Sequence, residues 1–68
     1  MAGAKIIRQI LIERDITIKD FAALYGIAYQ SMRTKLLRDA FTYEEMLKIA
    51  DILNCDVKII TRDGGKMF

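Results

Sequence analysis

The side chains best suited to recognition chemistry lie together in residues 27–38. This stretch holds three cationic residues, Arg33, Lys35 and Arg38, and no acidic one. The amide of Gln30 can bond adenine through two atoms, and the guanidinium of Arg33 can bond guanine or a phosphate. A basic stretch in a chain with a net charge of only +2 indicates a polyanionic partner on one face. Three charges taken alone are more often an ordinary solvated helix face.

The charge is also unevenly divided along the chain. Residues 1–38 carry seven basic and three acidic side chains, a net charge of +4. Residues 39–68 carry four basic and six acidic side chains, a net charge of −2. The basic half therefore contains the stretch suited to a polyanion.

The composition argues against enzymatic chemistry. The chain has no histidine, so Ser-His and Cys-His pairs are excluded, and its single cysteine, Cys55, cannot form an internal disulfide. Zinc-finger and haem ligand sets are excluded for the same reason. We therefore expect no catalytic residue, no metal, no cofactor and no small-molecule substrate. Cys55 is expected to be a small buried apolar residue.

The 68 residues, 53% hydrophobic and 29% charged, are expected to form a single folded domain over 1–68. The longest stretch without charge, Phe21–Met32, is 12 residues long and too short to cross a membrane. No apolar segment follows Lys5 as it would in a signal peptide. With one cysteine and no export signal, a cytoplasmic protein without membrane contact is expected.

Apolar periodicity and end signals divide most of the chain into four helices. Thr17 with Asp20, and Thr42 with Glu45, match capping boxes at helix starts, and Gly26 tolerates the left-handed backbone that ends a helix. The helices are expected over about residues 4–14, 18–25, 28–37 and 43–53, the last ending at Asn54. The residues expected to face inward are Ile6, Ile7, Ile10 and Leu11 in the first helix, Met32, Leu36 and Leu37 in the third, and Met46, Leu47, Ile49, Ala50 and Leu53 in the fourth.

The last part of the chain changes to the period of a strand. Residues 57–62 are rich in β-branched side chains and nearly alternate, which predicts a strand, and Asp63-Gly64-Gly65 is typical of a turn. Residues 66–68 are long enough for a short returning strand. An exposed strand is a template for pairing with a second copy, so a homodimer is expected. The pairing residues would be Val57, Ile59 and Thr61; the alternative is a hairpin folded back on its own helices.

A short capped helix, a glycine turn and a second helix with polar and basic outer residues make a helix-turn-helix, whose second helix lies in the major groove of double-stranded DNA. The expected base contacts come from Tyr29, Gln30, Arg33 and Thr34. The expected phosphate contacts, which position the protein without reading sequence, come from Thr17, Lys19, Ser31, Lys35 and Arg38. Alternatively, Tyr29 covers the edge of the core, and Lys35 and Arg38 are ordinary solvated charges.

The segment 17–33, TIKDFAALYGIAYQSMR, resembles the Cro/repressor-type (XRE-like) helix-turn-helix of phage repressors and small bacterial regulators. Ala22 stands where that family packs a small residue between the two helices, Gly26 occupies its turn, and Gln30 and Ser31 look like the polar pair that opens its recognition helix. Residues 41–54 look like its fourth helix.

The resemblance covers about residues 5–56. It implies a mainly α, four-helix fold of the lambda-repressor type, with a short C-terminal β-strand or hairpin, that binds an operator as a dimer. Two positions depart from the pattern. Ala28 stands where serine or threonine usually caps the recognition helix, and Ile18 replaces a polar residue that often contacts phosphate.

Two functions follow from these observations. The first is a sequence-specific DNA-binding transcriptional regulator, such as a repressor, of prophage or mobile-element type, with residues 28–37 as the recognition helix. The alternative is a protein-interaction module on the same fold, such as an antitoxin or anti-repressor. A polar, cationic outer face on that helix favours DNA, whereas an apolar outer face favours a protein partner.

Overall fold

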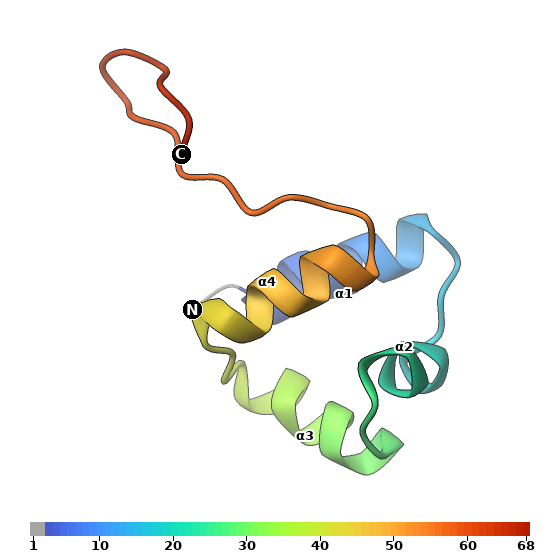
Figure 1. Cartoon of the computed structure of the whole chain (residues 1–68). Helices are drawn as coiled ribbons and strands as arrows, with labels where there is room; N and C mark the ends of the chain where they lie inside the picture. The colour runs from blue at the N-terminus through green and yellow to red at the C-terminus, as the bar shows by residue number, and fades with distance from the viewer. Residues whose placement is uncertain (1–2) are drawn as a thin grey trace.

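The computed structural model describes residues 3–68 and contains four helices in chain order (Figure 1). The mainly helical, four-helix architecture is therefore confirmed. None of the helices in the described part of the chain is long and apolar enough to cross a membrane. The helices are α1 (Gly3–Glu13), α2 (Ile18–Tyr25), α3 (Tyr29–Arg38) and α4 (Tyr43–Ile52).

The ends of α2 follow from single residues on either side of it. The Thr17 hydroxyl accepts a hydrogen bond from the Asp20 amide at 3.1 Å, which satisfies one of the free donors of the first turn. Gly26 ends the helix in the left-handed conformation, with φ +96°, and its amide donates to the Ala22 carbonyl at 2.9 Å. The Ile27 amide donates to the same carbonyl at 3.1 Å. This tight turn brings α3 directly back against α2.

The start of α4 carries the complete capping box. The Thr42 hydroxyl accepts from the Glu45 amide, and the Glu45 carboxylate accepts from the Thr42 amide at 3.0 Å. The backbone turns left-handed at Asn54, with φ +56°, just after the helix. Both end signals of this helix are therefore used as its sequence indicates.

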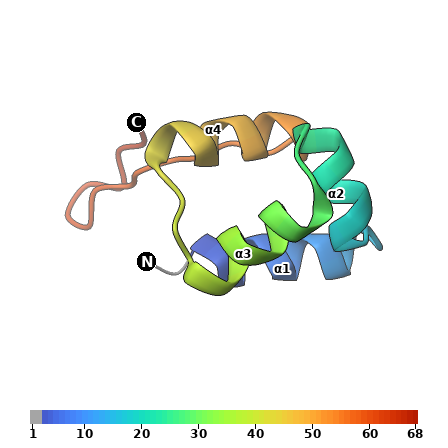
Figure 2. The ribbon, with the colours of Figure 1, turned by 90° about the horizontal axis from the view of Figure 1, so that it is seen from below.

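The four helices share one apolar core. Phe21, Ile7 and Met32 are the largest fully buried side chains, and α3 contributes only Met32 and Leu36 to the core. Viewed from below, α3 lies across the helical body, packed on α2 and α1, while α2 also contacts α4 (Figure 2). The recognition helix of the expected motif is therefore held by two buried apolar side chains.

The loop between α3 and α4 also completes the start of α1. The Asp39 carboxylate accepts a hydrogen bond from the Ala4 amide at 2.8 Å, although the two residues are 35 positions apart. Asp39 itself is left-handed, with φ +52°, and closes the end of α3. One aspartate thus serves the end of one helix and the beginning of another.

Three residues expected in the core are exposed instead. Leu37 is 71% exposed, Ile6 51% and Leu47 42%, so the prediction that they face inward is wrong. Successive residues of a helix are about 100° apart, so a helix that buries one residue turns its sequence neighbour aside. Leu37 follows the buried Leu36, Ile6 precedes the buried Ile7, and Leu47 follows the partly buried Met46.

The predicted strand over residues 57–62 is also wrong, as is the returning strand over 66–68. Among the described residues, only one antiparallel bridge forms there, between Ile60 and Met67. Hydrogen bonds join the backbones of Ile59 and Phe68 in both directions, at 3.3 and 2.9 Å. The Thr61 amide also donates to the Lys66 carbonyl at 2.9 Å, across the turn between them, but the described residues form no continuous ladder. We call residues 57–68 the hairpin segment; it stands away from the helices (Figure 1).

Replacing Gly26 by alanine should lower the free energy of unfolding by about 1–2 kcal/mol, the usual penalty for a left-handed residue with a side chain. An added Cβ at Gly26 would have no atom within 4 Å, so backbone strain alone causes the loss. Urea denaturation measures it. The control is Gly64→Ala, whose Cβ would make an ordinary contact at 3.8 Å to the Thr61 hydroxyl and which should leave stability nearly unchanged. A Gly26→Ala protein as stable as the parent would contradict this account of the turn.

Candidate nucleic-acid interface

The two sides of α3 differ sharply in chemistry. Met32 and Leu36 are buried against the other helices, one turn apart on the same face. Gln30, Arg33 and Thr34, which were predicted to contact bases, are all exposed on the other side. The helix therefore presents amide, guanidinium and hydroxyl groups to solvent, the groups that bond base edges.

Leu37 belongs to this exposed side as well. It follows Arg33 by four residues and Thr34 by three, spacings that place side chains on one face of a helix. An exposed leucine among polar groups offers an apolar contact, such as the one a thymine methyl group takes in the major groove. Pattern reading missed it because leucine next to the buried Leu36 was counted as core.

The first turn of α3 places Tyr29 beside Arg33. The Arg33 guanidinium carbon lies 5.7 Å from the centre of the Tyr29 ring, a cation–π arrangement. Tyr29 is exposed, so it lies with Arg33 on the solvent side and outside the apolar core. The contact restricts the long Arg33 side chain and holds its charge over the start of the helix.

The other polar groups of α3 are partly used within the helix. The Thr34 hydroxyl donates to the Gln30 carbonyl at 2.9 Å, which orients the threonine side chain along the helix. Ala28 precedes the helix in extended conformation and makes no side-chain hydrogen bond to the first turn. The family's usual cap is thus absent from the structure, as the alanine at this position implies.

The residues predicted to contact phosphate lie on different elements and in different surroundings. Lys19 and Ser31 are exposed in the first turns of α2 and α3, and Arg38 is exposed at the end of α3. The Thr17 hydroxyl already accepts the Asp20 amide as the α2 cap. Four of the five predicted residues are therefore at the surface; Lys35 differs.

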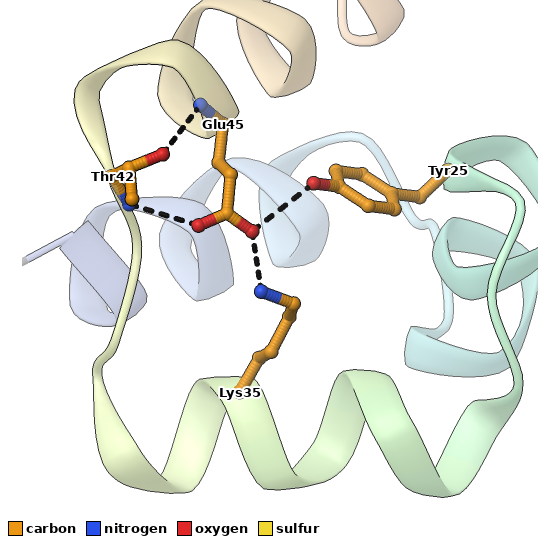
Figure 3. Close-up of polar contacts among 4 residues, drawn as sticks. All are labelled: Tyr25, Lys35, Thr42 and Glu45. Carbon is orange, nitrogen blue, oxygen red and sulfur yellow. Dashed lines mark hydrogen bonds and ion pairs between the residues drawn. The ribbon is translucent and has the colours of Figure 1, made fainter.

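Lys35 is half-buried and bonded within the protein. Its ammonium donates to the carboxylate of Glu45 on α4, and it lies 5.7 Å from the centre of the Phe41 ring (Figure 3). The hydroxyl of Tyr25 on α2 donates to the same carboxylate at 3.3 Å. The other oxygen accepts the Thr42 amide. We call Tyr25, Lys35, Thr42 and Glu45 the Glu45 cluster.

The Glu45 cluster shifts the pKa values of two of its members. The hydrogen bond from Lys35, supported by the Thr42 amide, lowers the pKa of the Glu45 carboxyl group from 4.5 to about 2. Burial raises the pKa of the Tyr25 hydroxyl, and the Glu45 charge adds to that rise. Glu45 is therefore an anion, and Tyr25 an uncharged hydrogen-bond donor, at neutral pH. Lys48 places its ammonium 4.1 Å from the centre of the Tyr25 ring.

Sequence reasoning found one half of this cluster and missed the other. The spacing of Thr42 and Glu45 indicated a capping box, which the structure contains. The same spacing says nothing of Lys35 and Tyr25, which reach Glu45 from other helices. The available signal was the position of Lys35 three residues after Met32, a spacing that places it near the buried side of α3.

Glu45→Gln should remove part of the pH dependence of stability. The folded protein holds the proton on this carboxyl group only near pH 2, whereas the unfolded chain binds it near 4.5. The ionised Glu45 carboxylate therefore makes its full contribution to the free energy of unfolding above pH 4.5, and this contribution is lost as the pH falls toward 2. Urea midpoints measured from pH 7 to 2.5 should be lower for Glu45→Gln than for the parent at pH 7 and should fall less steeply below pH 4.5.

The matched control is Glu44→Gln, which removes an exposed acid one position away from the cluster. Its urea midpoints should follow those of the parent through the same range. Parallel curves for Glu45→Gln and the parent would show that the ion pair with Lys35 does not contribute to folding.

Comparison with models of protein families identifies the family that has this arrangement. The Cro/C1-type HTH DNA-binding domain matches residues 6–58, well over half of the chain, and the match includes the Gly26 turn and all of α3. Comparisons with curated proteins and with solved structures gave no match. The resemblance to XRE-like regulators drawn from residues 17–33 is thereby confirmed. The chain belongs to the Cro/C1-type helix-turn-helix family of DNA-binding domains.

Proposed function

We propose that this protein is a sequence-specific transcriptional regulator that inserts α3 into the major groove of operator DNA. The observation that carries the proposal is the division of α3 into a buried apolar side and an exposed polar, cationic side. The polar side offers hydrogen bonds to bases, and the cations next to it offer contacts to phosphates. Membership of a DNA-binding family supports the same partner.

Within this proposal the exposed residues of α3 have different tasks. Gln30 and Arg33 read base edges through paired hydrogen bonds, with Arg33 held by Tyr29. Thr34 adds a hydroxyl, and Leu37 adds an apolar contact. The phosphate contacts come from Thr17, Lys19, Ser31 and Arg38, and from Lys35 only where a phosphate displaces Glu45.

We further propose that the regulator acts as a homodimer. One recognition helix reads only a few base pairs, whereas two helices one DNA turn apart, about 34 Å, read a palindromic operator. The hairpin segment supports association because it exposes apolar side chains on a surface outside α3. Val57, Ile59 and Thr61, expected to pair between chains, all lie in it.

The exposure of Leu37 favours the second candidate function, a protein-interaction module such as an antitoxin or anti-repressor. At 71% exposure it is the most apolar feature on the outer side of α3. A protein partner would bury it, and the cations around it would then matter little. A salt titration on random duplex DNA separates the two functions, because DNA binding must weaken steeply with salt. Absent or salt-independent binding at about 50 mM salt would favour the protein partner.

Gln30→Ala should relax specificity at one base pair. After an operator has been selected from a random duplex library, the variant should lose about 1–3 kcal/mol on that operator and bind changed bases at one position equally well. Gln9→Ala, which removes an exposed glutamine from α1, is the control and should bind like the parent. Unchanged affinity and specificity for Gln30→Ala would rule out this residue as a reader of bases.

Arg38→Ala should weaken binding to all duplexes alike and make the slope of log affinity against log salt shallower by about 0.9. Lys35→Ala should change the slope less, because its ammonium is already paired with Glu45 in the free protein. Fluorescence anisotropy at several salt concentrations measures both slopes. Equal changes for the two variants would mean that the Lys35–Glu45 pair opens on DNA.

A further inference from the structure

The hairpin segment exposes an unusual amount of apolar surface for its size. Ile59, Ile60, Met67 and Phe68 are each between 58% and 68% exposed. The segment stands clear of the helices, joined to them by the chain that follows α4 (Figure 1). Within the described chain, therefore, these four side chains are left largely in water, which is unfavourable for apolar groups.

A second apolar feature is a groove between α1 and α4. Its lining includes Ile6 and Ile10 from α1, Met46, Ile49 and Leu53 from α4, and Val57 at the start of the hairpin segment. Asp56 is the one charged residue in the lining. Ile6, which is 51% exposed, forms part of its rim. We call this feature the α1–α4 groove.

The two features carry opposite charge. The groove carries one negative charge in its lining, the carboxylate of Asp56, whereas Glu45 is paired with Lys35 and lies outside the lining. The hairpin segment holds three bases and one acid, a net charge of +2; they are Lys58, Arg62, Lys66 and Asp63. An apolar, cationic segment and an apolar groove whose one charged lining residue is Asp56 are complementary in both respects.

From this complementarity we propose that the hairpin segment of each chain docks in the α1–α4 groove of a second copy. The inference rests on the homodimer proposed above and names its surfaces. In the chain's own groove Val57 already lines one end, and the following residues lead away from it. Reciprocal docking covers both features of both copies and closes the assembly as a two-fold dimer.

The position of α3 is compatible with this contact. In Figure 1, α3 lies at the lower edge of the molecule, and the hairpin segment lies at the opposite edge, beyond α4. The lining of the α1–α4 groove contains no residue of α3. The dimer contact and the nucleic-acid interface use separate surfaces of the chain.

Sedimentation of the full chain with one groove variant and one hairpin variant tests the proposal. Ile6→Asp places a charge on the groove rim, and Ile60→Asp places one on the hairpin segment; both residues are more than half exposed, so the fold should persist. Each variant alone should raise the dimer dissociation constant at least about tenfold, equivalent to 1.4 kcal/mol. Ile12→Asp, at an exposed α1 position outside the groove lining, should dimerise like the parent.

Mixing the two variants gives the decisive comparison. A groove-defective chain still has an intact hairpin segment, and a hairpin-defective chain still has an intact groove, so the mixture should form a heterodimer through one contact. Direct pairing of two hairpin segments predicts otherwise: Ile6→Asp alone would dimerise normally, and mixing would add nothing. That result overturns groove docking but leaves the proposed homodimer standing.

The thiol of Cys55 provides an independent measurement. Cys55 lines the groove, is half-buried and is the chain's one cysteine. Docking should slow its reaction with dithionitrobenzoate as protein concentration rises, and Ile60→Asp should remove that dependence. A rate independent of concentration in the parent, or a parent that sediments only as a 7.8 kDa monomer, overturns the proposal. DNA binding by α3 is tested separately, by the affinity and specificity of the Gln30→Ala variant.

Discussion

Three helices meet at the carboxylate of Glu45, which receives the Lys35 ammonium from α3, the Tyr25 hydroxyl from α2 and the Thr42 amide at the start of α4. Since α3 has only Met32 and Leu36 in the core, this polar junction restricts how it can turn on the other helices. A charge shared by three partners tolerates little displacement, because a partly buried ion that loses a partner is costly. The outer side of α3 keeps its direction for this reason.

The same junction divides the cations of residues 27–38 into one that is paired inside the protein and two that are exposed. Lys35 neutralises Glu45 inside the protein, whereas Arg33 and Arg38 remain at the surface. From the sequence, Lys35 and Arg38 were both expected to contact phosphates and looked equivalent. Their difference arises from what faces each one in space, and it leaves fewer cations for a polyanion than their number in the sequence indicates.

Helix ends were predictable because their causes are local. The hydroxyls of Thr17 and Thr42 and the left-handed backbone at Gly26 and Asn54 act within a few residues, and the structure uses all four. The inward faces were less predictable, since Leu37 and Leu47 are apolar yet lie beside positions that fill the core. How the helices pack determines which of two neighbouring apolar residues is buried.

The strand was mispredicted for a different reason. Residues 57–62 have the β-branched composition of a strand, but a strand also needs a continuous partner to bond its backbone, and in the described chain this pairing is limited to one bridge, between Ile60 and Met67. For the candidate site, exposure of the residues proposed to read bases followed from the amphipathic pattern of α3. The partners of Lys35 did not, because they come from α2 and α4.

The hydrogen bond from the Ala4 amide to Asp39 has a consequence for biosynthesis. A ribosome makes α1 first, yet the acceptor for its first turn is added only 35 residues later. While the chain emerges, the beginning of α1 lacks this acceptor and has to be satisfied by water. The helix translated earliest is thus completed only when the loop after α3 has left the exit tunnel.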